Sequence, residues 1–265
     1  MNKLFISIAI MTIATTAFAQ SEQDTVSSEP QKNSWGAKLK ESNFHLCLQL
    51  QTKYIFRGME MMTEDAAPVV FPGIIYSNKG FNAYILGGYA LNGKYSLVDF
   101  GLSYSFWWLT ISLNDYYYPT TTSPIDRFFN YKTGQTGHWL EAVITFAPPK
   151  APVYLTVCNF FYGADRYSVV DDEGNKKEKQ AYSTYAEIGT YYDFLNNNRI
   201  SLAVGAALNK SCYNGYDKNF SVCNVELKYT YNAAIKNFII PLSVAGIYNP
   251  VCNKMHVNFV ASLAF

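Results

Sequence analysis

Charged side chains are scarce in this chain of 265 residues, where Asp, Glu, Lys and Arg make up 15%. That share is below the ~25% usual for soluble domains. Where polar and apolar residues alternate, the ionisable groups fall almost entirely on the polar side. This set comprises Lys53, Arg57, Asp99, Glu141, Glu187, Glu226 and Lys228, with His256 on the same side. Charges of both signs on one face could select a polar solute, or could pair with one another and brace the structure.

Hydrolytic chemistry has little support in the sequence. Barrel enzymes that cleave lipids pair a His with a Ser two residues later, so that both side chains share one face of a strand. Here the residues at that spacing are Cys47, Leu140 and Asn258. The five cysteines are scattered without the spacing of metal ligands, and a bridge between Cys212 and Cys252 is one option. We therefore predict no enzyme, no metal and no cofactor.

Strands must position the charged residues, because polar and apolar residues alternate with a period of two from Asn43 onward. Twelve such segments are predicted, an even number as in bacterial single-chain membrane barrels. They lie near residues 44–57, 68–77, 81–91, 95–107, 109–118, 138–147, 153–163, 181–194, 199–209, 220–231, 237–248 and 255–265. We predict an all-β fold, a transmembrane antiparallel up-and-down β-barrel. Its Leu, Phe and Ile faces meet lipid and its charges face a lumen. Asp115 is the exception and is placed at the extracellular rim.

The connections between these segments alternate in length. Short turns at 77–80, 148–151 and 195–198 alternate with long stretches at 119–137 and 164–180. Outer-membrane barrels have this asymmetry, with short periplasmic turns and long extracellular loops. The link 106–109 must turn without Gly, Pro or Asn. Clusters of Tyr, Phe and Trp at strand ends fit interfacial girdles.

The N-terminal region predicts export. Lys3, an apolar stretch at 4–13 and the small residues Ala17 and Ala19 are typical of a cleaved signal peptide over residues 1–19. Residues 20–42 are polar and aperiodic, and predict a flexible periplasmic leader. Residues 43–265 form the barrel. The expected location is the outer membrane of a Gram-negative cell.

The C-terminal strand carries an assembly signal. Phe259, Leu263 and the terminal Phe265 share one face, as expected of a strand that the outer-membrane barrel-assembly machinery reads. The expected partners are this machinery, outer-membrane lipid and a small polar solute. The formal net charge of +1 argues against nucleic acid.

Three motifs in order carry a family resemblance. They are Tyr54-Ile55-Phe56-Arg57-Gly58, then Asp99-Phe100-Gly101 with Asn114-Asp115-Tyr116-Tyr117-Tyr118-Pro119, and finally Glu141. Between residues 43 and 194 the chain resembles porins of the TorF type, bacterial outer-membrane proteins long classed as conserved proteins of unknown function. The resemblance implies a barrel and a pore, with no established substrate. The chain departs from the pattern at Met59-Glu60-Met61-Met62, where the family usually has a polar Ser/Gln pair.

Roles for the motif residues follow from their positions. Gly58 would allow a sharp departure from the first strand into an outer loop. Arg57 would lie just inside the mouth and pair with Asp99 or Glu141. Pro119 would end the fifth strand where its missing N–H does no harm.

We predict passage of small polar solutes through a narrow charged lumen, since twelve strands lie between filled and wide barrels. Two alternatives remain. One is a non-conducting surface barrel whose loops, at 119–137 and 164–180, bind a partner or a glycan. The other is an outer-membrane lipid hydrolase, which the missing His-x-Ser pair disfavours.

Overall fold

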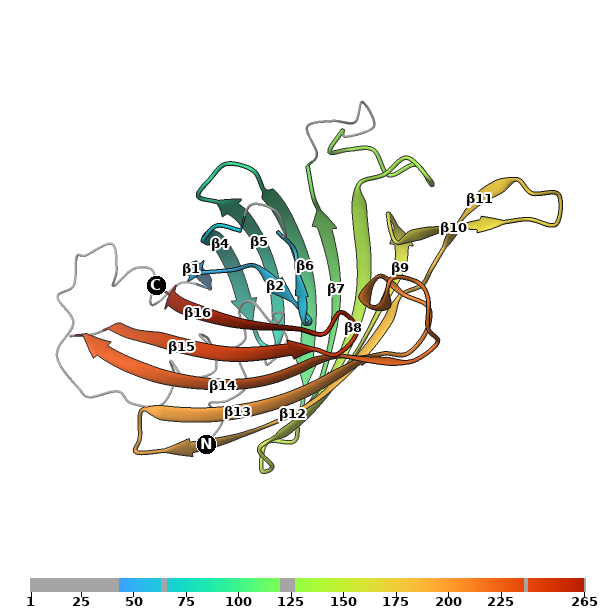
Figure 1. The fold of residues 1–265 in the computed structure, drawn as a ribbon. Coiled ribbons are helices and arrows are strands. Elements are labelled where there is room, and N and C mark those ends of the chain that lie inside the picture. The colour runs from blue at the N-terminus through green and yellow to red at the C-terminus, as the bar shows by residue number, and fades with distance from the viewer. Residues whose placement is uncertain (1–42, 63–65, 120–126, 236–237, 265) are drawn as a thin grey trace.

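The protein folds as a closed barrel of antiparallel strands (Figure 1). The computed structural model describes residues 43–62, 66–119, 127–235 and 238–264. The predicted signal peptide, the leader and Phe265 lie outside these residues. Twelve strands form the wall, and β1 closes it by pairing with both β4 and β16. The predicted fold class and strand number are therefore confirmed.

The wall strands match the predicted segments closely. They are β1 (Phe44–Gln51), β4 (Val69–Asn78), β5 (Phe81–Ala90), β6 (Ser96–Phe106), β7 (Leu109–Tyr117), β8 (His138–Phe146), β9 (Val153–Gly163), β12 (Thr184–Phe194), β13 (Asn198–Ala207), β14 (Ser221–Ile235), β15 (Phe238–Asn249) and β16 (Lys254–Ala264). The other elements are β2 (Ile55–Phe56), β3 (Met59–Glu60), β10 (Arg166–Val170), β11 (Lys176–Gln180) and the 3-10 helix η1 (Cys212–Asn214).

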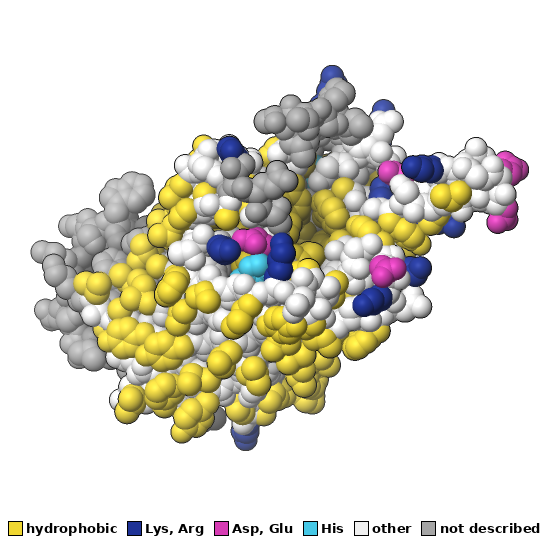
Figure 2. Space-filling view, viewed as in Figure 1, with side chains coloured by type: hydrophobic (Ala, Val, Ile, Leu, Met, Phe, Trp, Pro, Cys, Tyr) yellow, Lys and Arg dark blue, Asp and Glu magenta, His cyan; other side chains and the backbone are white. Residues whose placement is uncertain are grey.

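Side chains on each wall strand alternate between the two faces of the barrel. In β1, Leu46, Leu48 and Leu50 are 40–43% exposed on the outside, whereas Gln49 and Gln51 are buried inside. Figure 2 shows apolar side chains gathered over the wall formed by β13 to β16. This sorting is the pattern of a barrel whose outer wall contacts lipid.

Tight turns join the strands at the end of the barrel where β1 begins and β16 ends. The β6–β7 turn, which lacks Gly, Pro and Asn, is made by Trp107 at a φ of 56° followed by Trp108. Trp107 is 83% exposed, so its ring lies free of the barrel interior. The β4–β5 turn uses Lys79 and Gly80, both at positive φ.

Gly101 in β6 makes room for a tyrosine inside the barrel. It pairs across the sheet with Tyr84 of β5. A Cβ atom at Gly101 would lie 2.0 Å from the Tyr84 ring. The ring thus packs directly on the backbone of β6, which explains why the second motif needs glycine at this position.

The first predicted segment is too long in one respect. β1 ends at Gln51, and the chain then leaves the wall instead of continuing to Arg57. Asn258 of β16 holds the departure point: its Oδ1 accepts hydrogen bonds from the Thr52 hydroxyl and the Lys53 N–H, both at 3.0 Å. Residues after this point cannot follow the alternation of the wall.

Two elements extend beyond the wall at the opposite end. β10 and β11 form a separate two-stranded sheet that projects from the barrel (Figure 1). Within the described ranges, no helix is long and apolar enough to cross a membrane.

Candidate lumen site

A short hairpin enters the barrel directly after β1. We call residues 53–61 the lumen hairpin; it consists of β2, a turn at Arg57 and Gly58, and β3. The pair Phe56–Met59 closes the turn, and both turn residues have positive φ, 50° and 82°. This is the geometry of a two-residue hairpin loop of type I′. The role predicted for Gly58 is therefore corrected: it forms the tip of a hairpin inside the barrel, not the exit into an outer loop.

The tip of the lumen hairpin reaches nearly across the barrel. Arg57 binds Glu141 of β8 through two hydrogen bonds, Nη1 to Oε1 and Nη2 to Oε2, the second at 3.0 Å. From β1 to β8 the shorter route around the wall passes β4, β5, β6 and β7, which makes five steps of the six possible in a ring of twelve. Of the two partners that the sequence offers Arg57, the structure thus selects Glu141.

Aromatic rings surround the Arg57 guanidinium. Its Cζ lies 4.6 Å from the centroid of Phe56 and 5.1 Å from that of Tyr185. Nη1 also donates to the hydroxyl of Tyr213 in η1. A planar guanidinium suits this combination of a bidentate carboxylate and ring faces, whereas a lysine ammonium could not match it.

Within the predicted segment 44–57, Tyr54 and Phe56 share a face with Leu46, Leu48 and Leu50, so the sequence predicts that they face lipid, and this prediction is wrong. Both side chains are buried inside the barrel, at 1% and 2% exposure. The Tyr54 ring packs against Phe71 at 5.3 Å, and the Phe56 ring packs against Tyr116 at 6.0 Å. The strand alternation fails here because the chain has already left the wall at Gln51.

Gly58 fits the tip against β14 and β15. The β13–β14 register shifts between Gly205 and Ala206, which leaves Cys223 as the extra residue of a bulge. A Cβ at Gly58 would lie 2.1 Å from the Cys223 carbonyl oxygen, so only glycine fits this contact. Asn249 of β15 donates a hydrogen bond of 3.0 Å to the Gly58 carbonyl.

A network of hydrogen bonds holds η1 over the lumen hairpin. The Asp165 carboxylate accepts hydrogen bonds from the Ser183 N–H at 2.7 Å and from the Ser183 hydroxyl at 2.6 Å. That hydroxyl in turn accepts one from the Cys212 N–H at 2.9 Å. Burial raises the pKa of Asp165, although the hydrogen bonds from Ser183 oppose the rise. Burial likewise raises the pKa of Cys212 to about 12, so this thiol stays protonated.

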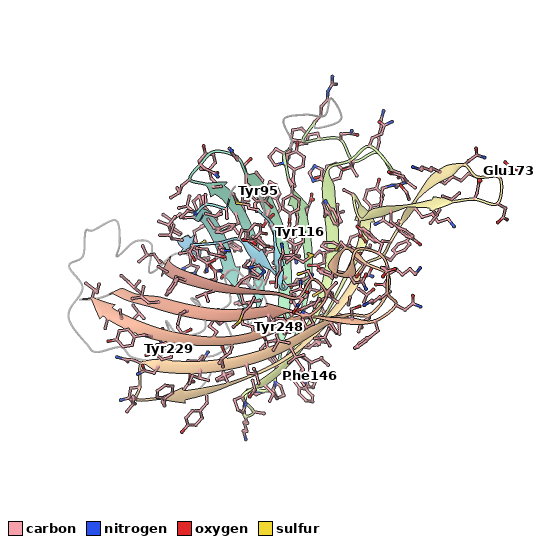
Figure 3. The ribbon with its side chains drawn as sticks, in the orientation of Figure 1. Tyr95, Tyr116, Phe146, Glu173, Tyr229 and Tyr248 are labelled. Carbon is pink, nitrogen blue, oxygen red and sulfur yellow. The ribbon has the colours of Figure 1, made fainter. Side chains whose placement is uncertain are left out.

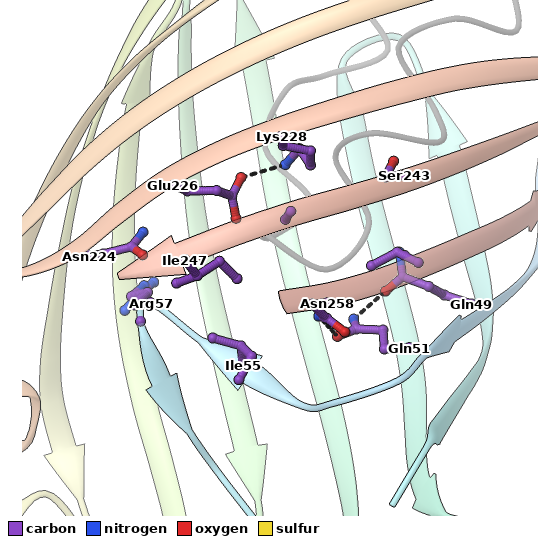
Figure 4. Close-up of a pocket in the computed structure, with 13 residues that line it drawn as sticks. Gln49, Gln51, Ile55, Arg57, Asn224, Glu226, Lys228, Ser243, Ile247 and Asn258 are labelled. Atoms are coloured by element: carbon purple, nitrogen blue, oxygen red, sulfur yellow. Dashed lines mark hydrogen bonds and ion pairs between the residues drawn. The ribbon is translucent and has the colours of Figure 1, made fainter. Parts of the chain in front are cut away.

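A polar cavity of about 50 Å³ lies beside the lumen hairpin (Figure 4). Glu226 and Lys228 of β14 line it and form an ion pair of 2.8 Å. Gln51 lines it as well, and is joined to Asn258 by a hydrogen bond of 3.3 Å. The cavity has room for more than one water, and its amides and ion pair could bind a small polar solute.

The base of the lumen hairpin carries a second ion pair. Lys53 Nζ lies 2.9 Å from Glu60 Oε1, and His256 Nδ1 lies 3.6 Å from the other oxygen of Glu60. The Lys53 side chain is 36% exposed. Lys53 belongs to the lumen hairpin, because β1 ends at Gln51. The sequence predicted it in a wall strand.

The remaining predicted carboxylates differ in their surroundings. Glu187 of β12 accepts hydrogen bonds from Tyr154 at 2.8 Å, from Asn224 at 3.0 Å and from Tyr185. Asp99 of β6 pairs in register with Tyr116 and is fully buried on the lumen side. Among the described residues, neither of its carboxylate oxygens has a hydrogen-bond partner.

Several other motif residues do not contact the lumen hairpin and lie at the rim or on the outer wall. Tyr117 packs at the rim against His138, at 4.7 Å between ring centroids. Asp115 binds the same His138 at 2.8 Å and lies at the rim. Pro119 is exposed two residues beyond β7. In β16, Phe259 is 57% exposed on the outer wall, while Leu263 is half-buried.

Sequence reasoning missed several residues that hold the lumen hairpin. Tyr213, Asn249 and Cys223 contact its tip, yet they lie 156 or more residues away along the chain. No local spacing relates them to Arg57. None of the five cysteines forms a disulfide, and Cys212 and Cys252 are both free thiols. The described part of the chain contains no group of three or more His, Cys, Asp or Glu side chains that could hold a metal ion.

Comparison with known proteins shows no family for this chain. No protein-family model matches the sequence, and no curated protein matches it. Similar solved structures include the NanC porin, with a TM-score of 0.48 and 9% identity over 83% of this chain and 98% of that one. The KdgM porin has a TM-score of 0.46 and 8% identity over 83% and 98%. The translocator domain of the autotransporter NalP from Neisseria meningitidis has a TM-score of 0.43 and 9% identity over 87% and 94%. The resemblance to TorF-type porins thus stays a prediction.

Proposed function

We propose that this protein is an outer-membrane channel for small polar solutes, in which the lumen hairpin narrows the path. The observation that carries the proposal is the sorting of side chains by the barrel wall. Leu202, Leu227, Val257 and Phe259 are 45–58% exposed on the outside. A closed barrel satisfies the backbone hydrogen bonds of its wall strands within the sheet, which is the requirement for crossing lipid.

The location follows from the same sorting. A charge on the lipid face would cost about 2–4 kcal/mol for Lys or Arg at mid-bilayer. Glu141, Glu187, Glu226 and Lys228 all lie on the inner face instead. With the export signal predicted for residues 1–19, this supports the outer membrane of a Gram-negative cell.

The lumen has the properties of a selective path. The Glu226–Lys228 pair and the amides of Gln49 and Gln51 line the cavity, and these groups can replace water around a small polar solute. The lumen hairpin crosses the path, and Arg57 at its tip binds Glu141 of β8. We propose that this arrangement is a closed form, which opens when the hairpin leaves its contacts.

The experiment compares the whole protein with a variant in which residues 53–61 are replaced by a Gly/Ser linker of equal length. Both are purified from outer membranes, tested for heat-modifiable gel migration and recorded in planar bilayers. We expect small, infrequent conductance from the natural protein and larger, sustained conductance from the variant. A folded variant that neither conducts nor admits solutes into liposomes would remove the channel and leave the barrel.

A second candidate function is binding of a partner by the surface loops. Its support is the β10–β11 hairpin, which projects from the rim and carries the ion pairs Arg166–Glu178 and Lys177–Asp171. Replacing residues 166–180 with a short linker separates the two functions. Loss of binding to whole cells or glycans with unchanged conductance would support this candidate.

A further inference from the structure

Among the described residues, one lumen carboxylate has no compensating partner, whereas Glu60, Glu141, Glu187 and Glu226 do. Glu60, Glu141 and Glu226 each pair with a Lys or an Arg. Glu187 accepts hydrogen bonds from two tyrosines and an asparagine. Asp99 is the exception: it is 0% exposed, and neither of its oxygens accepts a hydrogen bond from a described residue.

Three tyrosines pack together near Asp99, where the lumen hairpin meets β6. The Tyr95 ring lies 5.7 Å from the Tyr54 ring and 6.2 Å from the Tyr118 ring. All three side chains lie within electrostatic range of Asp99. The Tyr95 hydroxyl is buried and, like Asp99, has no hydrogen-bond partner in the described part of the chain. Figure 3 labels Tyr95 and Tyr116 in the same region of the barrel, beside β5 to β7.

The described groups around Asp99 do not supply the counter-charge that it lacks. Two further carboxyl groups, Asp115 and Glu141, lie within electrostatic range of Asp99 and disfavour its charge. Arg57 is already committed to Glu141. An ionised carboxylate without water, hydrogen bonds or a counter-charge is strongly unfavourable, so a buried carboxyl group is paired, binds a cation or takes up a proton.

We propose that Asp99 and Tyr95 bind a small monovalent cation, for which Na⁺ is the probe. Carboxylate and phenol oxygens suit hard cations, not soft ones. One carboxylate balances one positive charge, and complete burial favours a bare ion over a bulky organic cation. The cation links the wall at β6 to the base of the lumen hairpin through Tyr54, which packs on Tyr95. This inference does not depend on conduction.

The test measures the temperature at which the folded, fast-migrating gel band is lost. The full protein in detergent is compared in sodium chloride and in N-methyl-D-glucamine chloride at equal ionic strength and neutral pH. With Na⁺ at about ten times its Kd, we expect the midpoint to rise by roughly 3–5 °C. Asp99→Asn should abolish the difference, and Tyr95→Phe should reduce it.

Glu187→Gln is the matched control, because it removes a lumen carboxylate that already has hydrogen-bond donors. This variant should keep the sodium effect whatever its overall stability. Equal midpoints for the natural protein in both salts would overturn the proposal. The proposal would also be overturned if lowering the pH without sodium raised the midpoint of the natural protein to that of Asp99→Asn. A proton would then occupy the carboxyl group.

Discussion

Replacing Arg57 with alanine should release the lumen hairpin. The substitution removes both bonds to Glu141, the bond to Tyr213 and the contacts with the Phe56 and Tyr185 rings. Glu141 is fully buried, and its remaining donor is the Tyr116 hydroxyl at 2.8 Å. Breaking a buried pair by removing one partner costs about 3–5 kcal/mol. That energy corresponds to a factor of roughly 10²–10³ or more in the ratio of seated to released hairpin.

The assay is single-channel recording of folded protein, with open probability as the readout. We expect Arg57→Ala to be open far more often than the natural protein. Arg57→Lys keeps the charge without the bidentate geometry and should be intermediate. The double variant Arg57→Ala/Glu141→Ala no longer buries a lone carboxylate, so its effect should be smaller than the sum of the single ones. Unchanged open probability in folded Arg57→Ala would refute the idea that this pair closes the lumen.

Three further outcomes are expected. Gly58→Ala should raise open probability because its Cβ would lie 2.1 Å from a β14 carbonyl oxygen, while Gly174→Ala, at the same φ of 82° with open space around it, should not. Cys252 is exposed beside the long-loop end of the barrel, so an impermeant maleimide should label it on intact cells and leave the buried cysteines of the wall unlabelled; absence of labelling would place this turn inside the cell envelope. The hydrogen bond from Lys177 lowers the pKa of Asp171, so its stabilisation of the β10–β11 turn should hold at pH ~5 and be lost as pH falls below about 4. Amide exchange of that turn should show no such step in Asp171→Asn.

The wall could be predicted from sequence because each strand carries its own signal. Leu46, Leu48 and Leu50 point outward by the same period of two that turns Gln49 and Gln51 inward. The wall strands repeat this local rule, so their number could be predicted. The β6–β7 turn also followed, although Trp107 supplies a positive φ that Asn or Gly usually provides.

The lumen hairpin could not be predicted by the same rule. β2 and β3 have two residues each, too few to show a period. Tyr54 and Phe56 continue the alternation of β1, so the sequence predicts that they face lipid. Arg57 at positive φ gives no turn signal of the Asn-Gly kind. The contacts that hold the tip come from η1, β8, β14 and β15, which only the closed barrel brings together.

The order in which contacts can form follows from the anchors of the lumen hairpin. Arg57 meets partners 84 and 156 residues later in the chain, and Gly58 meets Asn249 after 191 residues. Such distant contacts are the slowest to form, because the intervening chain must be ordered first. The hairpin can therefore seat only once nearly the last strand is in place. During insertion the barrel would therefore pass through a stage in which the lumen hairpin is not fully seated, and a chain halted before β15 would lack the hydrogen bond from Asn249 to Gly58.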